Sequence, residues 1–187
     1  KLSNFKSKME SNPVNKSKKK ILVFVPEFPR LTETFIQRDI SGLIELGNLE
    51  VLVFSLKQTN DELFPNVAPC VVYQRLKFPT LLKAGFYFLF KFPRRLWRTL
   101  IFFLSAKEKS IPQKLFWFIK SMGYAYLFTK HTPDCIYANF MSWPSTVAMI
   151  SSQLLDVPYA ISAHAKDILT ESEFVKEKVE TAKFITI

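Results

Sequence analysis

Short, unbroken apolar runs that alternate with helix-like stretches constrain the fold of this chain more than any other feature. Residues 21–25 form such a run, which is typical of a strand buried in a parallel sheet. Residues 51–55 and 70–73 form two more runs of this kind. Between the first two, residues 32–46 repeat apolar side chains at helical spacing. A strand, a helix and a strand in this order predict an α/β fold built on a parallel sheet.

The helix predicted over residues 32–46 has recognisable boundaries. A loop with two prolines over 26–31 precedes it, and Thr32 can cap its first turn. Gly47 and Asn48 are residue types that end helices, because they adopt positive φ at low cost. The apolar spacing predicts a buried side formed by Phe35, Ile36, Ile40, Leu43, Ile44 and Leu46.

The same alternation resumes in the last third of the chain. A strand is predicted over 134–138, followed by a helix over 144–155 with Pro144 in its first turn. A strand over 157–162, a short polar helix from about 170 and a final strand over 183–187 complete the pattern. Together the two halves predict a Rossmann-like parallel sheet with helices on both faces. Because the final strand is apolar and no turn follows it, we expect the chain to be part of a longer protein.

Residues 80–104 interrupt this pattern with aromatic and basic side chains, and they predict an inserted helical segment. Apolar residues fill 84–90 and 100–104. Between them lies a cluster of basic residues around a tryptophan: Lys91, Arg94, Arg95, Trp97 and Arg98. From 63 to 107 the chain has eight lysines and arginines but no aspartate or glutamate. Uncharged runs stay far below the roughly 18–20 residues of a membrane span, and a further helix is predicted over 112–130.

The net charge of +10 makes the position of the basic residues informative about partners. Aromatic and basic side chains without acids, as in 80–104, suit the plane of an anionic bilayer, where each basic side chain adds about 1 kcal/mol. The alternative is a core helix pair with a basic outer face. We expect no nucleic-acid partner, because no motif for one is present and 80–104 is too apolar to track phosphates.

The first residues differ from the rest of the chain in composition. Residues 1–20 hold seven lysines and one glutamate, with serine and asparagine between them and no apolar periodicity. A segment of this kind cannot bury enough apolar area to fold. We therefore expect a disordered basic tail over 1–19, followed by a single domain over 20–187.

Glycine and cysteine usage argues against several classes of protein. Only four glycines are present, and no glycine-rich fingerprint for a dinucleotide or a nucleoside triphosphate occurs. Cys70 and Cys135 each fall inside a predicted strand and form no Cys-x-x-Cys motif, so neither a zinc site nor a redox pair is indicated. Two buried free thiols, without a secretory signal, fit a reducing, cytoplasmic setting. No cofactor is indicated.

Three segments share their pattern with a known family. Residues 28–36 read Phe-Pro-Arg-Leu-Thr-Glu-Thr-Phe-Ile, similar to F-P-x-x-S-E-T-F-I. Residues 136–140 read Ile-Tyr-Ala-Asn-Phe, similar to I-H-A-H-F, and residues 157–168 are similar to (I/V)-P-(F/Y)-x-x-(S/T)-A-H-A-x-D-I. In this order and spacing they resemble the N-terminal domain of family-four glycosyltransferases, in the branch that makes bacterial exopolysaccharides such as colanic acid. Residues 182–187 look like the strand before a T-I-S-x-x-N turn in that family.

The resemblance implies one half of a GT-B fold, in which two Rossmann-like domains face each other across a cleft. The N-terminal domain of that fold holds the acceptor, and the C-terminal domain, which we expect to be absent here, holds the nucleotide sugar. The implied reaction is retaining transfer of a hexose to a saccharide or lipid-linked acceptor in surface polysaccharide synthesis, with no metal. The implied location is the inner face of a membrane, and this fragment alone is expected to be inactive.

His164 is the catalytic candidate, because it follows a predicted strand and ligands of open α/β sheets bind beyond the carboxyl ends of strands. Its ring can hydrogen-bond a sugar hydroxyl, and by resemblance it would contact the transferred sugar. The alternative is a histidine that only fastens its own loop. Asp167 can orient His164 or bind an acceptor hydroxyl, or it can cap the next helix. Lys166, between them, is expected to lie in solvent.

The first strand–helix connection supplies three substrate-binding candidates. Glu33 and Thr34 lie at the predicted helix start, where free N–H groups favour a phosphate or developing negative charge. Residues 32–34 could equally form a capping arrangement that only starts the helix. Arg30 can meet an anionic acceptor, or it can be an exposed surface arginine.

Asn139 ends a predicted strand and is a candidate contact to an acceptor hydroxyl. Tyr137 and Asn139 stand where the family commonly has histidine; Asn139 can donate and accept hydrogen bonds but cannot carry a proton. Trp143 can stack on a sugar face, although an aromatic before a proline-started helix is more often a packing residue. His131 is expected at the surface.

A second function from a different class stays open. A non-catalytic Rossmann-like module that docks on an anionic membrane or a partner would show the same basic, aromatic segment. The two readings differ in whether a donor-binding domain follows residue 187.

Overall fold

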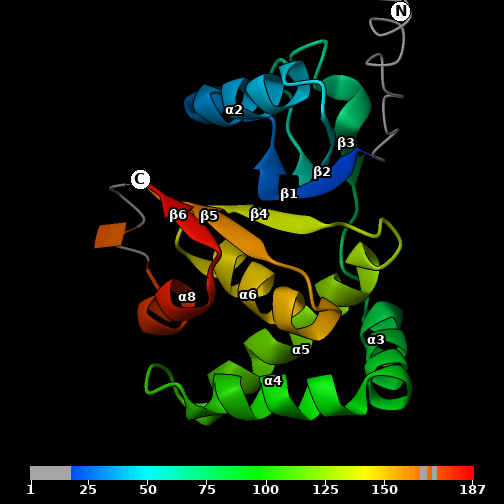
Figure 1. The fold of residues 1–187 in the computed structure, drawn as a ribbon, viewed down its shortest axis with the longest axis vertical. Helices are drawn as coiled ribbons and strands as arrows, with labels where there is room; N and C mark the ends of the chain where they lie inside the picture. The colour runs from blue at the N-terminus through cyan, green and yellow to red at the C-terminus, as the bar shows by residue number, and fades with distance from the viewer. Residues whose placement is uncertain (1–17, 165–167, 170–171) are drawn as a thin grey trace, which may run out of the picture.

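Six parallel strands in the order β3-β2-β1-β4-β5-β6 form the sheet at the centre of the molecule (Figure 1). The computed structural model describes residues 18–164, 168–169 and 172–187. The strands are β1 (Lys19–Phe28), β2 (Leu49–Gln58), β3 (Val71–Tyr73), β4 (Cys135–Asn139), β5 (Tyr159–Ser162) and β6 (Phe184–Thr186). This strand order is that of the Rossmann fold. The prediction of a Rossmann-like α/β fold is confirmed.

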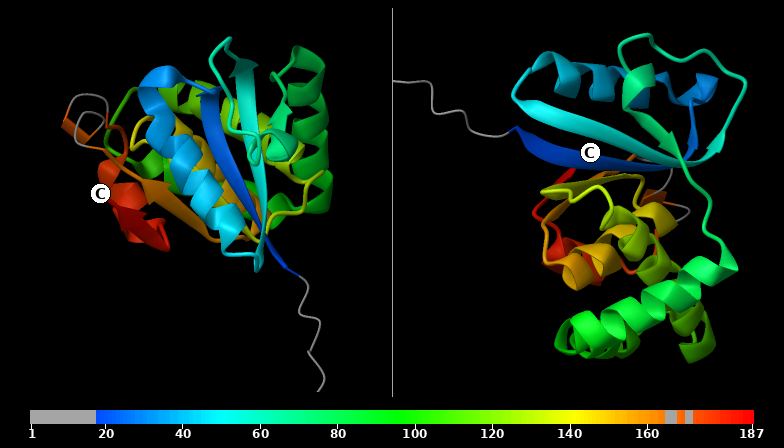
Figure 2. Two further views of the ribbon diagram at one scale, coloured as in Figure 1. Left: turned by 90° about the horizontal axis from the view of Figure 1, so that it is seen from above. Right: turned by 90° about the vertical axis from the view of Figure 1, so that its right-hand side faces the viewer.

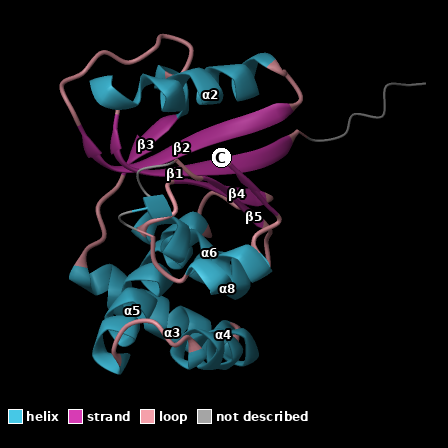
Figure 3. Ribbon diagram, turned by 90° about the vertical axis from the view of Figure 1, so that its left-hand side faces the viewer, coloured by secondary structure: helices cyan, strands magenta, loops and turns pink. Residues whose placement is uncertain are grey.

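Helices cover both faces of the sheet, as expected (Figure 3). One face carries α2 (Thr34–Glu45), which follows the 3-10 helix η1 (Leu31–Glu33). The helices on the other side are α3 (Phe78–Lys91), α4 (Pro93–Ser105), α5 (Ile111–Phe128), α6 (Trp143–Leu155) and α8 (Val175–Thr181). A second 3-10 helix, η2 (Ala68–Cys70), leads into β3, so Cys70 precedes the strand that was predicted to contain it.

β1 is twice as long as the apolar run that predicts it. Its pairing with β2 starts at Lys19, which the expected tail over 1–19 had included, and residues 1–17 lie outside the described residues. At the other end, Glu27 and Phe28 pair with Lys57 and Gln58, so the loop predicted over 26–31 begins only after Phe28. The register passes over Pro26, which has no N–H to donate. A proline at this point therefore interrupts the ladder without ending the strand.

The start of α2 differs from its prediction, while most of its buried side is confirmed. Thr32 lies in η1, and Glu33 is the residue that precedes α2, without a side-chain cap hydrogen bond. Ile36 and Ile40 are buried against Val23, Val25 and Val53 of the sheet, with Phe35, Leu43 and Ile44 packed around them. Leu46 is 65% exposed, because it lies one residue past the end of α2. Gly47 follows at φ 71°, the left-handed conformation expected of a glycine that ends a helix.

The larger core lies on the opposite face, between the sheet and α5 and α6. α6 packs directly on β1, β4 and β5, and α5 packs on α6. Phe24 of β1 is fully buried at the centre, with ring contacts to Phe54, Tyr124, Phe128 and Trp143. This aromatic packing fixes the position of Trp143, the first residue of α6.

The inserted segment is a pair of helices, α3 and α4, that forms an outer layer below α5 and α6 (Figure 2). Ala84, Phe88, Thr99 and Phe103 are buried against the inner helices. The outer side is apolar as well as basic. The exposed apolar side chains of α3, α4 and the neighbouring α5, called the outer apolar residues below, are Phe78, Leu82, Phe86, Leu89, Phe90, Trp97, Ile101, Ile111, Leu115, Phe116 and Ile119. None of the helices among the described residues has the length and apolar character to cross a membrane.

Candidate functional site

A pocket lies where the strand order reverses. From β1 the chain runs outward through β2 and β3, then returns beside β1 as β4 and runs outward the other way through β5 and β6. Connections that leave the carboxyl ends of β1 and β4 therefore diverge and open a crevice. The pocket there has a volume of about 670 Å³ and is called the cleft pocket. It is lined by Pro26, Glu27, Arg30, Thr32, Glu33, Phe35, Phe140, Ser142, Trp143, Pro144 and His164.

The loop after β1 forms one wall of the cleft pocket and is braced by the turn after β2. The Leu31 N–H donates to Asp61 Oδ2 over 2.8 Å, and the Thr59 hydroxyl donates to the Pro29 carbonyl. Arg30 Nη1 lies 3.3 Å from Glu33 Oε1. The predicted anion-binding arginine is therefore already paired with a carboxylate. The Arg30 side chain is 47% exposed, and a pair that is open to solvent on one side is weak, so a ligand can compete for the guanidinium.

Glu33 lines the pocket, whereas Thr34 is not among its lining residues. Glu33 precedes the first residue of α2, so its carboxylate lies at the positive end of the helix dipole. That negative charge makes the helix start less suited to a phosphate than its backbone alone would be. The same carboxylate is well suited to accept hydrogen bonds from hydroxyl groups.

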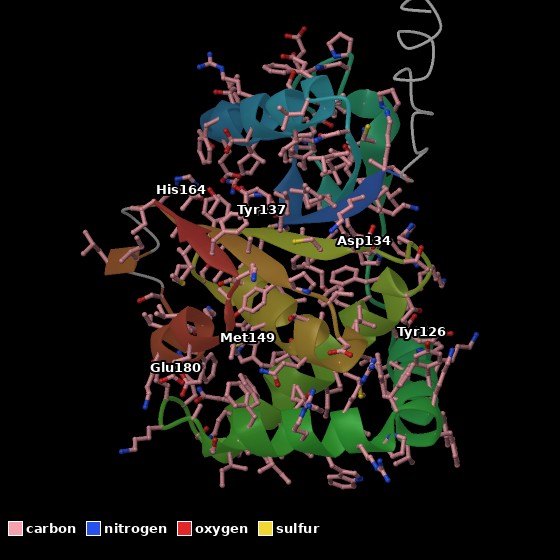
Figure 4. The ribbon with its side chains drawn as sticks, viewed as in Figure 1. Tyr126, Asp134, Tyr137, Met149, His164 and Glu180 are labelled. Carbon is pink, nitrogen blue, oxygen red and sulfur yellow. The ribbon has the colours of Figure 1, made fainter. Side chains whose placement is uncertain are left out.

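His164 also lines the pocket, two residues after the end of β5. The Ala163 N–H donates to the Thr186 carbonyl over 2.8 Å, which fixes the chain just before His164. Its ring centroid lies 4.5 Å from that of Phe35 and 5.6 Å from that of Phe140, and Nε2 lies 3.5 Å from Ser162 Oγ. His164 is half-buried, and Figure 4 shows it at the other end of the sheet from Asp134. Two aromatic rings thus pack against a half-buried histidine that lines the pocket.

Asn139 does not line the cleft pocket, although it ends β4 next to it. Its side chain is 1% exposed, and neither its Nδ2 nor its Oδ1 has a hydrogen-bond partner in the described part of the chain. Leaving a buried amide unsatisfied costs about 1–3 kcal/mol. The predicted contact with an acceptor hydroxyl would therefore need the loop after β4 to move.

Phe140, which sequence reasoning missed, turns the chain at the end of β4. Its φ of 78° is in the left-handed region, which is uncommon for a bulky residue. Its N–H donates to the Ser162 carbonyl over 2.7 Å. Strained backbone of this kind is often found at functional sites, and here it presents the Phe140 ring to the pocket. The sequence signal was weak: an aromatic residue directly after a strand.

Lys178 is a second residue that sequence reasoning missed. It is fully buried, although lysines on short polar helices normally lie in solvent. Its Nζ donates to the Met141 carbonyl over 2.6 Å and to the Ser142 carbonyl over 2.9 Å. α8 thereby holds the loop that forms the pocket wall before Trp143.

The remaining candidates fall into three groups. Asp167 and Lys166 lie outside the described residues. Trp143 packs, with its ring stacked 5.9 Å from that of Trp117, and it also lines the pocket; stacking on a sugar face stays a prediction. His131, expected at the surface, is half-buried, with its ring centroid 6.2 Å from that of Phe54.

Neither metal ligation nor thiol chemistry is indicated by the described residues. They contain no group of three or more His, Cys, Asp or Glu side chains that could hold a metal ion. Cys70 and Cys135 are free and half-buried, and burial raises the pKa of both thiols, which favours the unreactive form.

No model of a known protein family matches the chain, and none of the curated proteins compared with it is similar enough to count as a relative.

Proposed function

We propose that this chain is the acceptor-binding half of a retaining glycosyltransferase, which transfers a hexose from a nucleotide sugar to a saccharide or lipid-linked acceptor in surface polysaccharide synthesis. One observation carries the proposal. The three segments that resemble the family lie far apart in the sequence, yet residues from each line the cleft pocket: Arg30 and Glu33, Phe140, and His164. Because the carboxyl ends of neighbouring parallel strands meet at one edge of the sheet, the support for the proposal lies in which side chains meet there: a carboxylate, a guanidinium, an aromatic ring and a histidine.

The chemistry of the cleft pocket supports a sugar as its ligand. It contains two carboxylates, Glu27 and Glu33, one guanidinium and one histidine. Carboxylates accept hydrogen bonds from hydroxyl groups, and the aromatic rings of Phe35 and Trp143 offer apolar faces beside them. In this proposal Glu33 orients the acceptor hydroxyl, and His164 hydrogen-bonds the transferred sugar near its reacting carbon.

The same pocket is poorly suited to the phosphates of a nucleotide sugar. Its cation, Arg30, is paired with Glu33, and a second carboxylate lies nearby. Stabilising a departing nucleotide requires cations or helix N-termini without such competition. We therefore propose that a further domain holds the donor, and that residues 1–187 alone transfer no sugar.

The outer helices support a peripheral position on the inner face of a membrane. The outer apolar residues of α3 and α4 lie among the eight basic side chains of 63–107, a stretch without acids, and those of α5 follow this stretch. Apolar side chains that enter a bilayer and cations that meet its anionic headgroups act together in this arrangement. A lipid-linked acceptor would be reached from that position.

The test uses the full natural gene product with labelled nucleotide hexoses and a lipid-linked saccharide acceptor. Transfer with retention of the anomeric configuration is expected, and His164→Ala should lower kcat about 100-fold or more. His131→Ala is the matched control, because the second histidine of the chain lies against Phe54, away from the cleft pocket.

Equal activity of the His164→Ala variant and the natural protein, or an inverted product, would contradict the proposal. Vesicle binding without any sugar transfer would favour the non-catalytic docking module instead.

A further inference from the structure

A second pocket adjoins the cleft pocket and has a different chemistry. It has a volume of about 530 Å³ and lies between the ends of β1 and β2 and the helices α3 and α5. It shares Pro26, Glu27 and Trp143 with the cleft pocket. We call it the basic pocket; its other lining residues are Leu56, Lys57, Arg75, Leu76, Lys77, Phe78, Leu81, Phe116, Lys120 and Tyr124.

Four cationic side chains and one carboxylate line the basic pocket. Glu27 is that carboxylate, and it lies 3.4 Å from Lys57. Arg75, Lys77 and Lys120 enter no ion pair with any residue that the structure describes. Unneutralised like charges gathered around one cavity repel one another, and an anion that binds there relieves that repulsion.

Lys120 is the least hydrated of these cations. Its Nζ lies 5.1 Å from the ring centroid of Phe116, 4.8 Å from that of Trp117 and 5.7 Å from that of Trp143. Aromatic faces attract an ammonium group but do not neutralise it. Burial lowers the pKa of Lys120, as expected for a cation that has lost water without gaining a carboxylate. A half-buried ammonium in this state binds an anion more strongly than one in solvent.

Part of the rim of the basic pocket is apolar, and it is formed by residues that do not line the cleft pocket. Phe78 is 71% exposed and Phe116 57% exposed, and both line the pocket. Along α3, Leu82 and Phe86 follow Phe78 at four-residue spacing, so they lie on the same side of the helix. From the cleft outward, the molecule thus presents a hydroxyl-binding pocket, a cationic pocket and exposed apolar side chains.

We propose that the basic pocket binds the phosphate or diphosphate group that joins the acceptor's saccharide to its lipid. The order of sugar, phosphate and hydrocarbon in such a molecule matches the order of the three surfaces. The inference rests on the proposed function and narrows it: the acceptor is a lipid phosphate saccharide, not a free sugar or the end of a polysaccharide. Lys120 contacts the phosphate, and Trp143 separates it from the saccharide.

The test measures binding to the 187-residue chain through its tryptophan fluorescence, because Trp117 and Trp143 lie against Lys120. Three soluble probes separate the sources of binding: geranyl diphosphate, inorganic pyrophosphate and geraniol. Geranyl diphosphate is expected to bind about tenfold more tightly than pyrophosphate, and geraniol least tightly. If pyrophosphate binds as tightly as geranyl diphosphate, the occupant is a soluble phosphate compound and the proposal is overturned.

Substitutions then locate the site. Lys120→Met keeps the apolar stem of the side chain and should weaken the binding of geranyl diphosphate about tenfold. Thermal unfolding checks that the variant folds. Lys83→Met removes the same charge from an exposed position of α3 that does not line the pocket. If both variants weaken geranyl diphosphate binding equally, the effect comes from the overall charge and not from the pocket. If Lys120→Met does not weaken binding, the proposed site is wrong. Arg75→Met tests the same pocket with a cation that lies outside the aromatic cluster.

The two proposals fail in different ways. In the full natural gene product, Lys120→Met should raise the KM for the lipid acceptor. If sugar is transferred and this KM does not change, the phosphate site is wrong and the proposed glycosyltransferase function still holds. If the protein transfers no sugar but binds a diphosphate in a way that depends on Lys120, the proposed glycosyltransferase function is wrong and the phosphate site still holds.

Discussion

The cleft pocket and the basic pocket touch at Pro26, Glu27 and Trp143, yet they have opposite charge. Two carboxylates and one paired guanidinium line the first, whereas four cations and one carboxylate line the second. The cleft pocket is built by loops at the ends of β1, β4 and β5. The basic pocket depends on α3 and α5 and on the segment that leads into α3.

This difference shows what the inserted helices contribute. The sheet edge alone provides a pocket suited to neutral hydroxyl groups. The insertion adds exposed apolar side chains and one wall of a neighbouring pocket, whose cations come from β2, from the segment before α3 and from α5. Together these features suit an anionic amphiphile. Different elements therefore hold the two pockets in place. A variant that loosens one of these elements should affect one pocket more than the other.

The largest effect is expected when the brace of the cleft pocket is removed. Lys178→Met leaves the buried carbonyls of Met141 and Ser142 without the donors they have now, so the free energy of unfolding should fall by about 2–4 kcal/mol. Urea unfolding measures this change. Lys176→Met is the control on the same helix, because Lys176 is exposed and lies 3.8 Å from Glu180 in a weak ion pair; its change should stay within about 0.5 kcal/mol.

Hydrogen exchange sharpens that comparison. In the Lys178→Met variant, amides of residues 140–142 should exchange faster, while those of residues 81–88 in α3 keep their protection. Equal loosening of both regions, or no loss of stability, would show that α8 does not specifically support the cleft.

A smaller effect is expected on membrane binding. Phe86 and Phe90 are 62% and 78% exposed, with rings stacked at 6.3 Å, so replacing both by serine should leave folding intact. Binding to vesicles that contain phosphatidylglycerol should weaken roughly tenfold to a hundredfold, because two large apolar side chains no longer enter the bilayer. Vesicle flotation measures the partition.

The control for that pair removes two exposed apolar side chains from the other side of the sheet. Leu31 and Leu46 are 72% and 65% exposed and flank α2. Replacing both by serine should leave vesicle binding unchanged. If this variant loses binding as strongly as the phenylalanine variant, the outer helices are not the membrane-facing side.

The sequence predicted the sheet, the helices on both faces and the strand ends that meet at the cleft, because these follow from local periodicity and from the geometry of parallel strands. Glu33, Arg30 and His164 lie around one pocket for this reason. The extension of β1 past Pro26 was missed, since a proline argues against a strand unless the register passes over it.

The remaining differences depend on tertiary packing, which no local pattern carries. Asn139 follows the strand rhythm, but whether its amide faces the pocket or the interior is decided by the left-handed turn at Phe140. Lys178 looks like a solvated lysine until α8 packs over the loop after β4. The basic composition of 63–107 was visible, whereas the pocket that gathers part of it exists only once α3 lies against α5.

The smallest change in stability is expected when one methyl group is added at the contact between α3 and α5. A Cβ at Gly123 of α5 would lie 2.7 Å from Leu81 Cδ2 and 2.8 Å from Leu76 Cδ1, and both leucines line the basic pocket. At Gly42 of α2, nothing lies within 4 Å of the added atom. Because alanine favours a helix over glycine equally in both, the difference between the two variants isolates the packing term.

We expect Gly42→Ala to stabilise the protein by about 0.5–1 kcal/mol and Gly123→Ala to destabilise it by about 1 kcal/mol. Thermal and urea unfolding measure both variants. Gly123→Ala should also weaken geranyl diphosphate binding, because Leu76 and Leu81 must move, while Gly42→Ala leaves it unchanged. A Gly123→Ala variant as stable as Gly42→Ala would mean that α3 yields freely, and a basic pocket with such a wall could not hold its cations in the arrangement that the phosphate site requires.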